Sequence, residues 1–270
     1  MKISIIGTGY VGLVTGTCFA EVGHNVICVD CDKKKIDLLQ AGEIPIYEPG
    51  LKDLVEKNVD AGRLSFTDST AEGVERADVI FIAVPTPPLE DGSVDLSFIE
   101  LVAREIADCM SSYKIIVDKS TVPVKTGEKV AETIKRYCKS DCDFDVISNP
   151  EFLREGFAVE DLMKPDRIVI GSGSERPNKA MQEIYKPFNA PIIFTDINKD
   201  GMKTSPNFDE TIKIAEISNC PVVISGGVSS INDIKKAKDL NNKKIEGIIV
   251  GKAIYDGDIK LDELAKEIDA

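Results

Sequence analysis

A glycine-rich turn between a short apolar run and a helical pattern is the feature that most constrains this fold. Lys2–Ile6 is the apolar run, the sequence G-T-G-Y-V-G follows it at positions 7–12, and the helical pattern ends near Gly23. A second apolar run, Asn25–Val29, ends at Asp30. This order predicts a β-α-β unit that binds a dinucleotide, because it consists of a strand, a G-x-G-x-x-G turn, a helix, a second strand and an acid.

The spacing within the turn has a chemical reason at each glycine. The first glycine permits a tight turn, the second lets a pyrophosphate approach the backbone, and the third lets the helix pack closely on the strand. The beginning of the helix then offers free N–H groups and a partial positive charge to the phosphates. The predicted cofactor-binding residues of the turn are Gly7, Gly9, Tyr10, Val11 and Gly12.

Asp30 is placed to accept hydrogen bonds from both ribose hydroxyls of an adenosine. A carboxylate there repels a 2′-phosphate, so the sequence favours NAD over NADP, although Lys33, Lys34 and Lys35 lie close enough to weaken that preference. A structural turn followed by a solvated lysine run is the alternative, and it leaves Asp30 without a role.

Strand and helix patterns alternate as far as about residue 197, which predicts a Rossmann-like α/β fold with a doubly wound parallel sheet. Asp78–Val84 shows no polar alternation, so we expect a strand that is buried on both faces. The sequence P-T-P-P ends this strand at positions 85–88 and can continue neither a sheet nor a helix. Ligands of open parallel sheets bind outside the carboxyl ends of strands, which makes Thr86 a candidate cofactor contact.

Two acids follow a later strand, which is expected over Asp145–Ser148. Glu151 and Glu155 are four residues apart, so a helical turn over this stretch would place both carboxylates on one face. They could then position a water and an alcohol beside a nicotinamide. A solvated helix start, where acids favour the helix dipole, is the alternative.

Six motifs in order resemble the N-terminal domain of the UDP-glucose dehydrogenases, nucleotide-sugar enzymes, from Met1 to about Ile197. They are GTGYVG at 7–12, YEPGL at 47–51, PTP at 85–87, STVP at 120–123, NPEFLREG at 149–156 and PDR at 165–167. The resemblance implies that Asp30 and Lys35 hold the adenosine ribose and that Thr86, Thr121 and Glu155 contact NAD. It also implies that Glu151 and Thr121 are catalytic, and that Glu151, Leu153 and Arg154 line the sugar.

This family oxidises a sugar C6 alcohol to a carboxylate with two NAD, through a thioester on a cysteine. The family's lysine, asparagine and cysteine lie beyond its first domain, and nothing after Ile197 matches them. Cys220 begins an apolar strand and is interpreted as a small core residue. We therefore expect an NAD-binding part of such an enzyme that does not complete the four-electron oxidation.

The remainder, 198–270, resembles the end of ProFAR isomerase, a (β/α)₈ barrel, and is expected to form a partial barrel segment after a first domain at 1–197. The motifs are TDI at 195–197, DG at 200–201, SGGVSS at 225–230 and VGKAIY at 250–255. Barrels bind phosphate with the loops after strands seven and eight, so Gly226, Gly227, Gly251 and Lys252 are candidate phosphate contacts. The resemblance places a general acid at Asp196, but the strand that carries the family's general base is absent. Ordinary β-α turns are the alternative.

Composition limits the partners. With 270 residues and a net charge of −13 the chain lacks the basic footprint of nucleic-acid or anionic-membrane binding, and no apolar run is long enough to span a bilayer. Seven scattered cysteines and a single histidine predict reduced cytoplasmic thiols and no metal site, despite the C-x-x-C spacing of Cys28 and Cys31. The expected ligands are NAD and a nucleotide sugar or sugar phosphate, and a homo-oligomer is left open.

Three interpretations therefore stand at the sequence level. The first is an NAD-binding domain joined to a barrel tail, the second is an isomerase-like phosphate-binding module, and the third is an inactive chimeric or misjoined chain. Thr195-Asp196-Ile197 occurs in both resemblances, which is where a join between two genes would be hardest to notice.

Overall fold

The computed structural model describes residues 1–269 and contains two compact units, Met1–Pro165 and Asp166–Ala270. The strands and helices of the first unit are β1 Lys2–Ile6, α1 Tyr10–Glu21, β2 Asn25–Val29, α2 Lys33–Gln40, α3 Leu51–Asp60, β3 Leu64–Thr67, α4 Thr70–Arg76, β4 Val79–Ile82, α5 Ser97–Cys109, β5 Lys114–Asp118, α6 Thr126–Tyr137, β6 Phe144–Ser148 and α7 Ala158–Met163. The alternation of strand and helix confirms the expected α/β class, and β4 is buried throughout, as its composition predicts.

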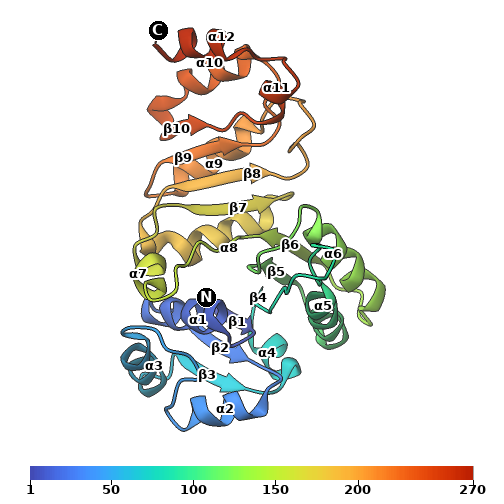
Figure 1. Cartoon of the computed structure of the whole chain (residues 1–270), viewed down its shortest axis with the longest axis vertical. Coiled ribbons are helices and arrows are strands. Elements are labelled where there is room, and N and C mark those ends of the chain that lie inside the picture. The colour runs from blue at the N-terminus through green and yellow to red at the C-terminus, as the bar shows by residue number, and fades with distance from the viewer. Residues whose placement is uncertain (270) are drawn as a thin grey trace. The chain divides into compact units, whose positions relative to one another are not determined.

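The strands of the first unit follow the order β6-β5-β4-β1-β2-β3, and each pair is parallel (Figure 1). The chain moves outward from β1 through β2 to β3, and then returns to the other side of β1 with β4. The order therefore reverses between β1 and β4. In open parallel sheets this switch point opens a crevice at the carboxyl ends of the strands, where ligands bind.

Helix α5 shows why the core of this unit forms where it does. Its buried residues Ile99, Val102, Ala103, Ile106 and Ala107 recur at the spacing of one helical face. That face packs in one hydrophobic cluster with side chains of the sheet, Ile80, Ile82 and Ile116 among them. The cluster holds the carboxyl ends of β4 and β5 in fixed positions, and the candidate site is built on those ends.

The second unit continues the alternation with β7 Ile168–Ser172, α8 Arg176–Tyr185, the 3₁₀ helix η1 Lys186–Phe188, β8 Ile192–Asp196, α9 Phe208–Ile217, β9 Val222–Ser225, α10 Ile231–Asp239, the 3₁₀ helix η2 Asn241–Lys243, β10 Ile245–Ile248, α11 Lys252–Tyr255 and α12 Leu261–Asp269. Its parallel strands lie in the order β10-β9-β8-β7 (Figure 1).

Strand β8 lies within the second unit, which begins at Asp166, whereas the motifs suggest a boundary near 197. The backbone of β8 pairs with β7 on one side and with β9 on the other. Strands on both sides of the motif boundary thus share one parallel ladder, and β8 belongs to the same unit as the residues that follow it. The division into an NAD-binding domain at 1–197 and a partial barrel segment at 198–270 remains a prediction.

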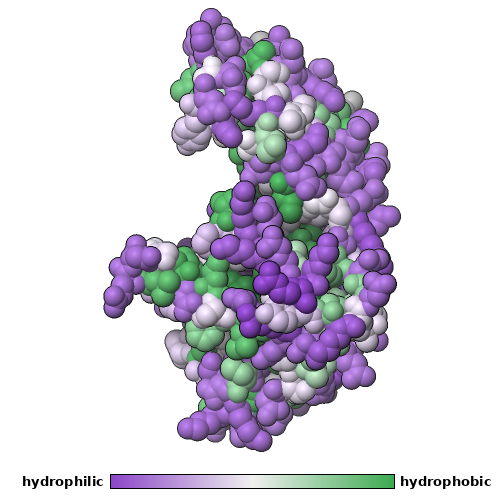
Figure 2. Space-filling view, turned by 90° about the vertical axis from the view of Figure 1, so that its right-hand side faces the viewer, coloured by the Kyte–Doolittle hydropathy of each residue, from purple (hydrophilic) through white to green (hydrophobic). Residues whose placement is uncertain are grey.

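The surface is rich in charge. Most of the face shown in Figure 2 is hydrophilic, with hydrophobic side chains in small scattered groups, as expected for a chain with 29% charged residues. Among residues 1–269, no helix combines the length and apolar content that a membrane crossing requires. Over the same described range, no group of three or more His, Cys, Asp or Glu side chains could hold a metal ion.

Candidate functional site

The glycine-rich turn lies at the switch point of the first sheet, and its three glycines have different surroundings. Gly7 has a φ of +107°, and a Cβ there would come 2.2 Å from the carbonyl oxygen of Ala83, the residue after β4. A Cβ on Gly12 would come 1.9 Å from the carbonyl oxygen of Gly7. A Cβ on Gly9 would meet nothing within 4 Å. Gly7 and Gly12 are therefore required by packing, whereas Gly9 leaves open space beside the backbone.

Helix α1 begins in that open space. Its N-cap is Gly9, which provides no side-chain cap, and its first turn contains no acid. The N–H groups at the beginning of an α-helix have no partner within the helix, and the helix dipole makes this end electropositive. An open approach at Gly9 and an uncapped helix end suit an anionic diphosphate, so the residues present fit the dinucleotide that the motif predicts.

Asp30 follows β2 and is buried beside the same turn, with 8% of its surface exposed. Its Oδ2 accepts hydrogen bonds from the N–H and hydroxyl of Thr8 at 2.8 and 2.7 Å, and its Oδ1 accepts the N–H of Asp32 at 2.9 Å. Lys35 Nζ lies 3.5 Å from Oδ2. Burial opposes ionisation, but these hydrogen bonds and Lys35 hold the pKa of the Asp30 carboxyl below its usual range. The carboxylate is thus charged and fixed at neutral pH. Asp30 and Lys35 lie close together, and their contact with a ribose stays a prediction.

Thr86 and Thr121 lie together after neighbouring strands. The Thr86 hydroxyl donates to the carbonyl oxygen of Thr121 at 3.0 Å, which joins the loop after β4 to the loop after β5. Ser120 strengthens the same junction, because its hydroxyl accepts the N–H of Val84 and donates to the carbonyl oxygen of that residue. Both threonines are therefore at the carboxyl edge of the sheet, as predicted.

The segment after β6 is not helical, which corrects the expectation of a helical turn over the two acids. Helix α7 begins only at Ala158, and Gly156 has a φ of +86°, a conformation that ends regular structure. Glu151 Oε2 instead accepts the N–H of Leu153 at 2.6 Å, which forms a tight local turn. Glu155 is exposed and lies in the following turn. The two carboxylates are therefore not held on a shared helical face.

The guanidinium of Arg154, a residue predicted to line the sugar, forms an ion pair with Asp161. Arg154 Nη2 lies 2.6 Å from Asp161 Oδ1, and Nε lies 3.1 Å from Oδ2. The Arg154 side chain is 70% exposed, whereas that of Asp161 is only 15% exposed. A substrate contact would require the guanidinium to exchange or share this partner.

Two buried charges lie beneath the same loops and were not singled out from the sequence. Lys119 is 2% exposed, and its Nζ lies 3.3 Å from Oδ1 of the buried Asn149. Burial lowers the pKa of Lys119 to about 8, although the nearby negative charge of Glu151 acts to raise it. Burial likewise raises the pKa of Asp118 to about 7. The available signal was two adjacent charged residues at the end of β5, Asp118 as its last residue and Lys119 directly after it.

The predicted phosphate residues of the second unit lie in the loops after β9 and β10. Gly226 and Gly227 have φ values of +86° and +87°, and a Cβ at either would come 2.9 Å from a backbone oxygen, that of Asp196 or of Ser205. Gly251 has open space around it, and Lys252 Nζ donates to the carbonyl oxygen of Gly201 at 2.9 Å. Close loop packing thus accounts for the first two glycines, and only Gly251 faces open space.

Asp196, which the barrel resemblance marks as a general acid, is buried in a hydrogen-bonded setting. Its Oδ2 accepts Asn207 Nδ2 at 2.7 Å, and its Oδ1 accepts the N–H of Asn198 at 2.9 Å. It is 7% exposed. These contacts fix the loop after β8, which gives Asp196 a structural role.

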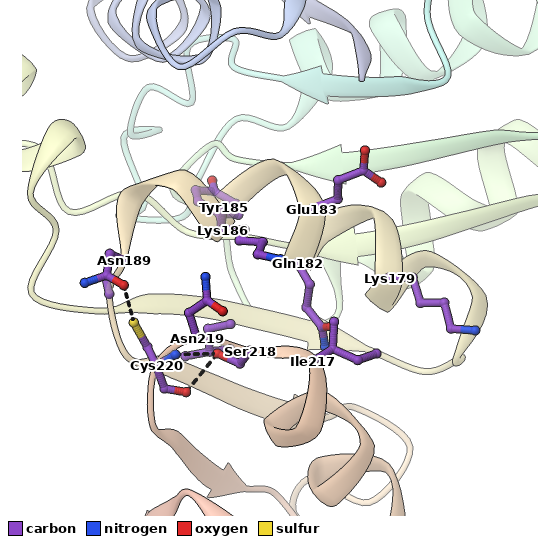
Figure 3. A pocket seen from close by; sticks show the side chains of 12 residues that line it. Lys179, Gln182, Glu183, Tyr185, Lys186, Asn189, Ile217, Ser218, Asn219 and Cys220 are labelled. Atoms are coloured by element: carbon purple, nitrogen blue, oxygen red, sulfur yellow. Dashed lines mark hydrogen bonds between the residues drawn. The ribbon is translucent and has the colours of Figure 1, made fainter.

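Cys220 lies at the amino end of β9, away from the loops that follow the strands. It is 8% exposed, and its Sγ lies 3.4 Å from Oδ1 of Asn189 (Figure 3). It lines a pocket of about 280 Å³ between α8 and the end of α9. Its burial agrees with the interpretation of a small core residue.

Two family models match the chain. The NAD-binding domain of the UDP-glucose/GDP-mannose dehydrogenase family matches residues 1–189, and a histidine biosynthesis protein family matches residues 158–260. The chain belongs to the UDP-glucose/GDP-mannose dehydrogenase family. Its cofactor is NAD. The two matches share 158–189, so the dehydrogenase domain passes into the second resemblance over α7, β7 and α8, a longer stretch than the tripeptide at 195–197.

Curated relatives agree with this family. UDP-glucose 6-dehydrogenase of Rhizobium meliloti is 53% identical over 250 residues, which cover 90% of this chain and 57% of the relative. UDP-glucose 6-dehydrogenase TuaD of Bacillus subtilis is 46% identical over 236 residues, covering 86% and 51%. These alignments extend past residue 197, although the family model ends at 189. This dehydrogenase-family chain spans about half the length of the curated relatives it matches.

Solved structures show the same relationship. A UDP-glucose dehydrogenase from Pyrobaculum islandicum superposes with a TM-score of 0.70 at 43% identity, over 72% of this chain and 46% of that one. A GDP-mannose dehydrogenase from Pseudomonas aeruginosa gives 0.70 at 41% identity, over 73% and 47%. The Rossmann-like parallel sheet is therefore shared with this family.

Proposed function

We propose that Met1–Pro165 binds NAD in the crevice between β1 and β4 and takes part in oxidising the primary alcohol of a nucleotide sugar of the UDP-glucose class. The observation that carries this proposal is the difference among the three glycines. Two are forced by packing, and the third, Gly9, opens the backbone toward the uncapped end of α1. Such an arrangement has no packing purpose, and it suits a diphosphate.

We propose the residue roles from the motif and the family resemblance, and the positions of the side chains support them. Gly7, Gly9 and Gly12 shape the turn, and the N–H groups of Tyr10 and Val11 face the diphosphate at the helix end. Asp30 and Lys35 hold the ribose, and the fixed carboxylate of Asp30 disfavours a 2′-phosphate. Thr86, Thr121 and Glu155 lie on the loops that would border the nicotinamide half.

NAD held by these residues would supply the acceptor for the hydride of the alcohol carbon. The chain's own residues manage the proton and the substrate. Glu151, held by the N–H of Leu153, is the group proposed to order water or take the hydroxyl proton, with Thr121 on the neighbouring loop. Leu153 and Arg154 are proposed to contact the sugar. This two-electron step yields an aldehyde, NADH and a proton.

The experiment that tests the proposal is a titration of the purified chain with NADH and with NADPH, followed by cofactor fluorescence. We expect saturable binding of NADH and at least about tenfold weaker binding of NADPH. Asp30→Ala is expected to weaken NADH binding and to reduce the discrimination, because the ribose loses its acceptor and the 2′-phosphate its repulsion. Asp37→Ala, which removes an exposed carboxylate from α2, is the matched control. Absence of saturable NADH binding would refute the proposal.

The second unit supports a weaker candidate, binding of a sugar phosphate at the loop before α11. The histidine biosynthesis match at 158–260 and the open space at Gly251 favour it. We propose Gly251 and Lys252 as its contacts, with Gly226 and Gly227 shaping the neighbouring loop. Isothermal titration with ribose 5-phosphate tests this candidate. Binding that survives Gly251→Asp would contradict it.

A further inference from the structure

Glu48 is a buried carboxylate for which the reaction chemistry gives no direct role. It is 3% exposed and lies between α2 and α3, in the loop that ends at Pro49 and Gly50. Its Oε2 accepts the Tyr10 hydroxyl at 2.8 Å and the N–H of Gly156 at 2.9 Å, and its Oε1 accepts the N–H of Ala158 at 2.8 Å. Among residues 1–269, no cationic side chain lies within ion-pair distance of it.

The donors come from the two sides of the candidate site. Tyr10 is the first residue of α1, whose beginning is the proposed contact of the diphosphate. Gly156 lies near the end of the segment that carries Glu151 and Glu155, and Ala158 begins α7. Glu48 therefore joins the proposed cofactor side to the proposed substrate side through hydrogen bonds alone.

Tyr10 has a choice of acceptors. Its hydroxyl lies 2.8 Å from Glu48 Oε2 and 2.7 Å from the carbonyl oxygen of Arg154, but it has one proton to donate. The N–H of Gly156 likewise lies within reach of both Glu48 and the Tyr10 oxygen, at 2.9 and 3.1 Å. Burial and the neighbouring Glu48 carboxylate raise the Tyr10 pKa, so the phenol keeps its proton at neutral pH.

The cost of weakening this network is high because, among residues 1–269, the donors to Glu48 are all neutral. A buried carboxylate that loses a donor keeps its desolvation penalty without compensation. A shift of Tyr10 must therefore be followed by the segment that holds Gly156 and Ala158. The geometry links the position of the first turn of α1 to the order of that segment.

We propose that Glu48 and Tyr10 are positioning residues that couple NAD binding at the glycine turn to the order of the segment Glu151–Ala158. This inference rests on the proposed NAD site. A diphosphate at the end of α1 fixes Tyr10, Tyr10 and Glu48 then hold the N–H groups of Gly156 and Ala158, and the segment beside the sugar becomes ordered. By thermodynamic reciprocity, an ordered segment strengthens NAD binding by the same factor.

The test is hydrogen–deuterium exchange at the amides of Gly156 and Ala158, measured with and without saturating NAD on the whole chain. In the parent chain we expect NAD to slow both amides about five- to hundredfold, the usual range of coupling between sites. In Glu48→Gln we expect both amides to exchange faster without NAD and to be slowed little by NAD. We also expect the dissociation constant of NAD to rise by a factor comparable to the slowing that is lost.

Tyr10→Phe is the milder variant, because it removes only a hydroxyl and retains the backbone N–H that faces the diphosphate. We expect it to reduce the NAD-induced slowing at Gly156 by about fivefold or more, on the scale of that coupling. Tyr47→Phe is the matched control, since Tyr47 is 87% exposed and its hydroxyl is expected to matter little. Circular dichroism confirms that each variant folds.

The outcomes separate this inference from the proposed function. If the parent chain and Tyr10→Phe bind NAD and show equal slowing at Gly156, the coupling is wrong while the NAD site stands. If NAD binds the parent chain and neither amide slows, the coupling is also wrong. If the parent chain does not bind NAD, the proposed function fails and the coupling fails with it.

Discussion

At the residue scale, the glycine turn shows that one residue type can serve two physical purposes within six positions. Gly7 and Gly12 are close to backbone oxygens. A side chain at Gly7 would push the turn away from the end of β4, and one at Gly12 would push α1 away from the turn. Gly9 contacts nothing within 4 Å on the side where a Cβ would lie, and its backbone is extended, a conformation that other residues adopt easily. Space at Gly9 is therefore available for a ligand and is not used by the fold.

We predict opposite outcomes for Gly9→Ala and Gly12→Ala. Gly9→Ala should leave the melting temperature nearly unchanged and weaken NADH binding about tenfold or more, because its methyl group meets the diphosphate and nothing else. Gly12→Ala should destabilise the domain by about 2 kcal/mol or more, because of overpacking against the Gly7 carbonyl. Thermal unfolding and NADH fluorescence measure both. Equal loss of stability in the two variants would contradict the distinction.

A second prediction at this scale concerns the pH dependence of stability through Asp118. Burial raises its pKa to about 7 in the folded chain, against about 3.9 when unfolded. Between these values the folded state binds more protons than the unfolded state, so the stability that Asp118 contributes is complete below pH 4 and is lost as the pH rises through 7.

Replacing Asp118 with Asn should consequently stabilise the chain by about 1–3 kcal/mol at pH 8 and have little effect near pH 4. Urea unfolding across this pH range is the measurement. The control is Asp143→Asn, an exposed carboxylate that precedes β6. A stability gain for Asp118→Asn that does not depend on pH would show that the charge is not its cause.

At the element scale, side chains at helix ends fix the loops that surround the candidate sites. Asp233, in the first turn of α10, accepts the Ser205 hydroxyl at 2.6 Å and the N–H groups of Ser229 and Ser230 at 2.9 and 3.2 Å. Burial opposes its ionisation, but these hydrogen bonds lower the pKa of Asp233. One carboxylate thus caps the helix and ties together the loops after β8 and β9.

We predict that Asp233→Ala destabilises the second unit by about 1–3 kcal/mol, the cost of a lost cap together with donors left unpaired. Because the folded pKa is depressed, this loss should be complete above pH 4 and should shrink as the pH falls below it. Asp239→Ala, at the exposed end of the same helix, removes the same charge without the cap and should change stability by about 0.5 kcal/mol or less. Equal melting temperatures for the two variants would contradict the capping role.

At the scale of the whole molecule, the two compact units imply a ligand response that is local. A ligand stabilises the cooperative unit that binds it, by about 2.7 kcal/mol at one hundred times its dissociation constant. The predicted NAD contacts all lie in Met1–Pro165.

We therefore predict that NAD slows hydrogen exchange in β4 and β5 of the first unit and leaves β9 of the second unit unchanged. Mass-spectrometric exchange after proteolysis resolves the two units within one sample, so each serves as the reference for the other. Equal protection of β9 would show that the units unfold together and would contradict this prediction.

The sequence by itself determined the Rossmann-like fold, its first two strands and the cofactor, because each depends on short-range patterns. The apolar runs, the G-x-G-x-x-G spacing and Asp30 are local signals whose physical meaning does not depend on distant residues. Strand β4 was expected over Asp78–Val84 but ends at Ile82, because its pairing with β1 and with β5 ends there.

Only the tertiary structure decided which residues meet. No local pattern shows that Glu48 accepts hydrogen bonds from Tyr10 and Gly156, which are separated from it by 38 and 108 positions. Nor does one show that Arg154 lies on Asp161, or that the acids after β6 lie in a turn and not on a helix. Strand β8 fits the motifs on both of its sides, and its backbone pairing alone assigned it to the second unit. Local propensity acts over a few residues, whereas the partners of a buried carboxylate or a strand edge are set by how the whole chain packs.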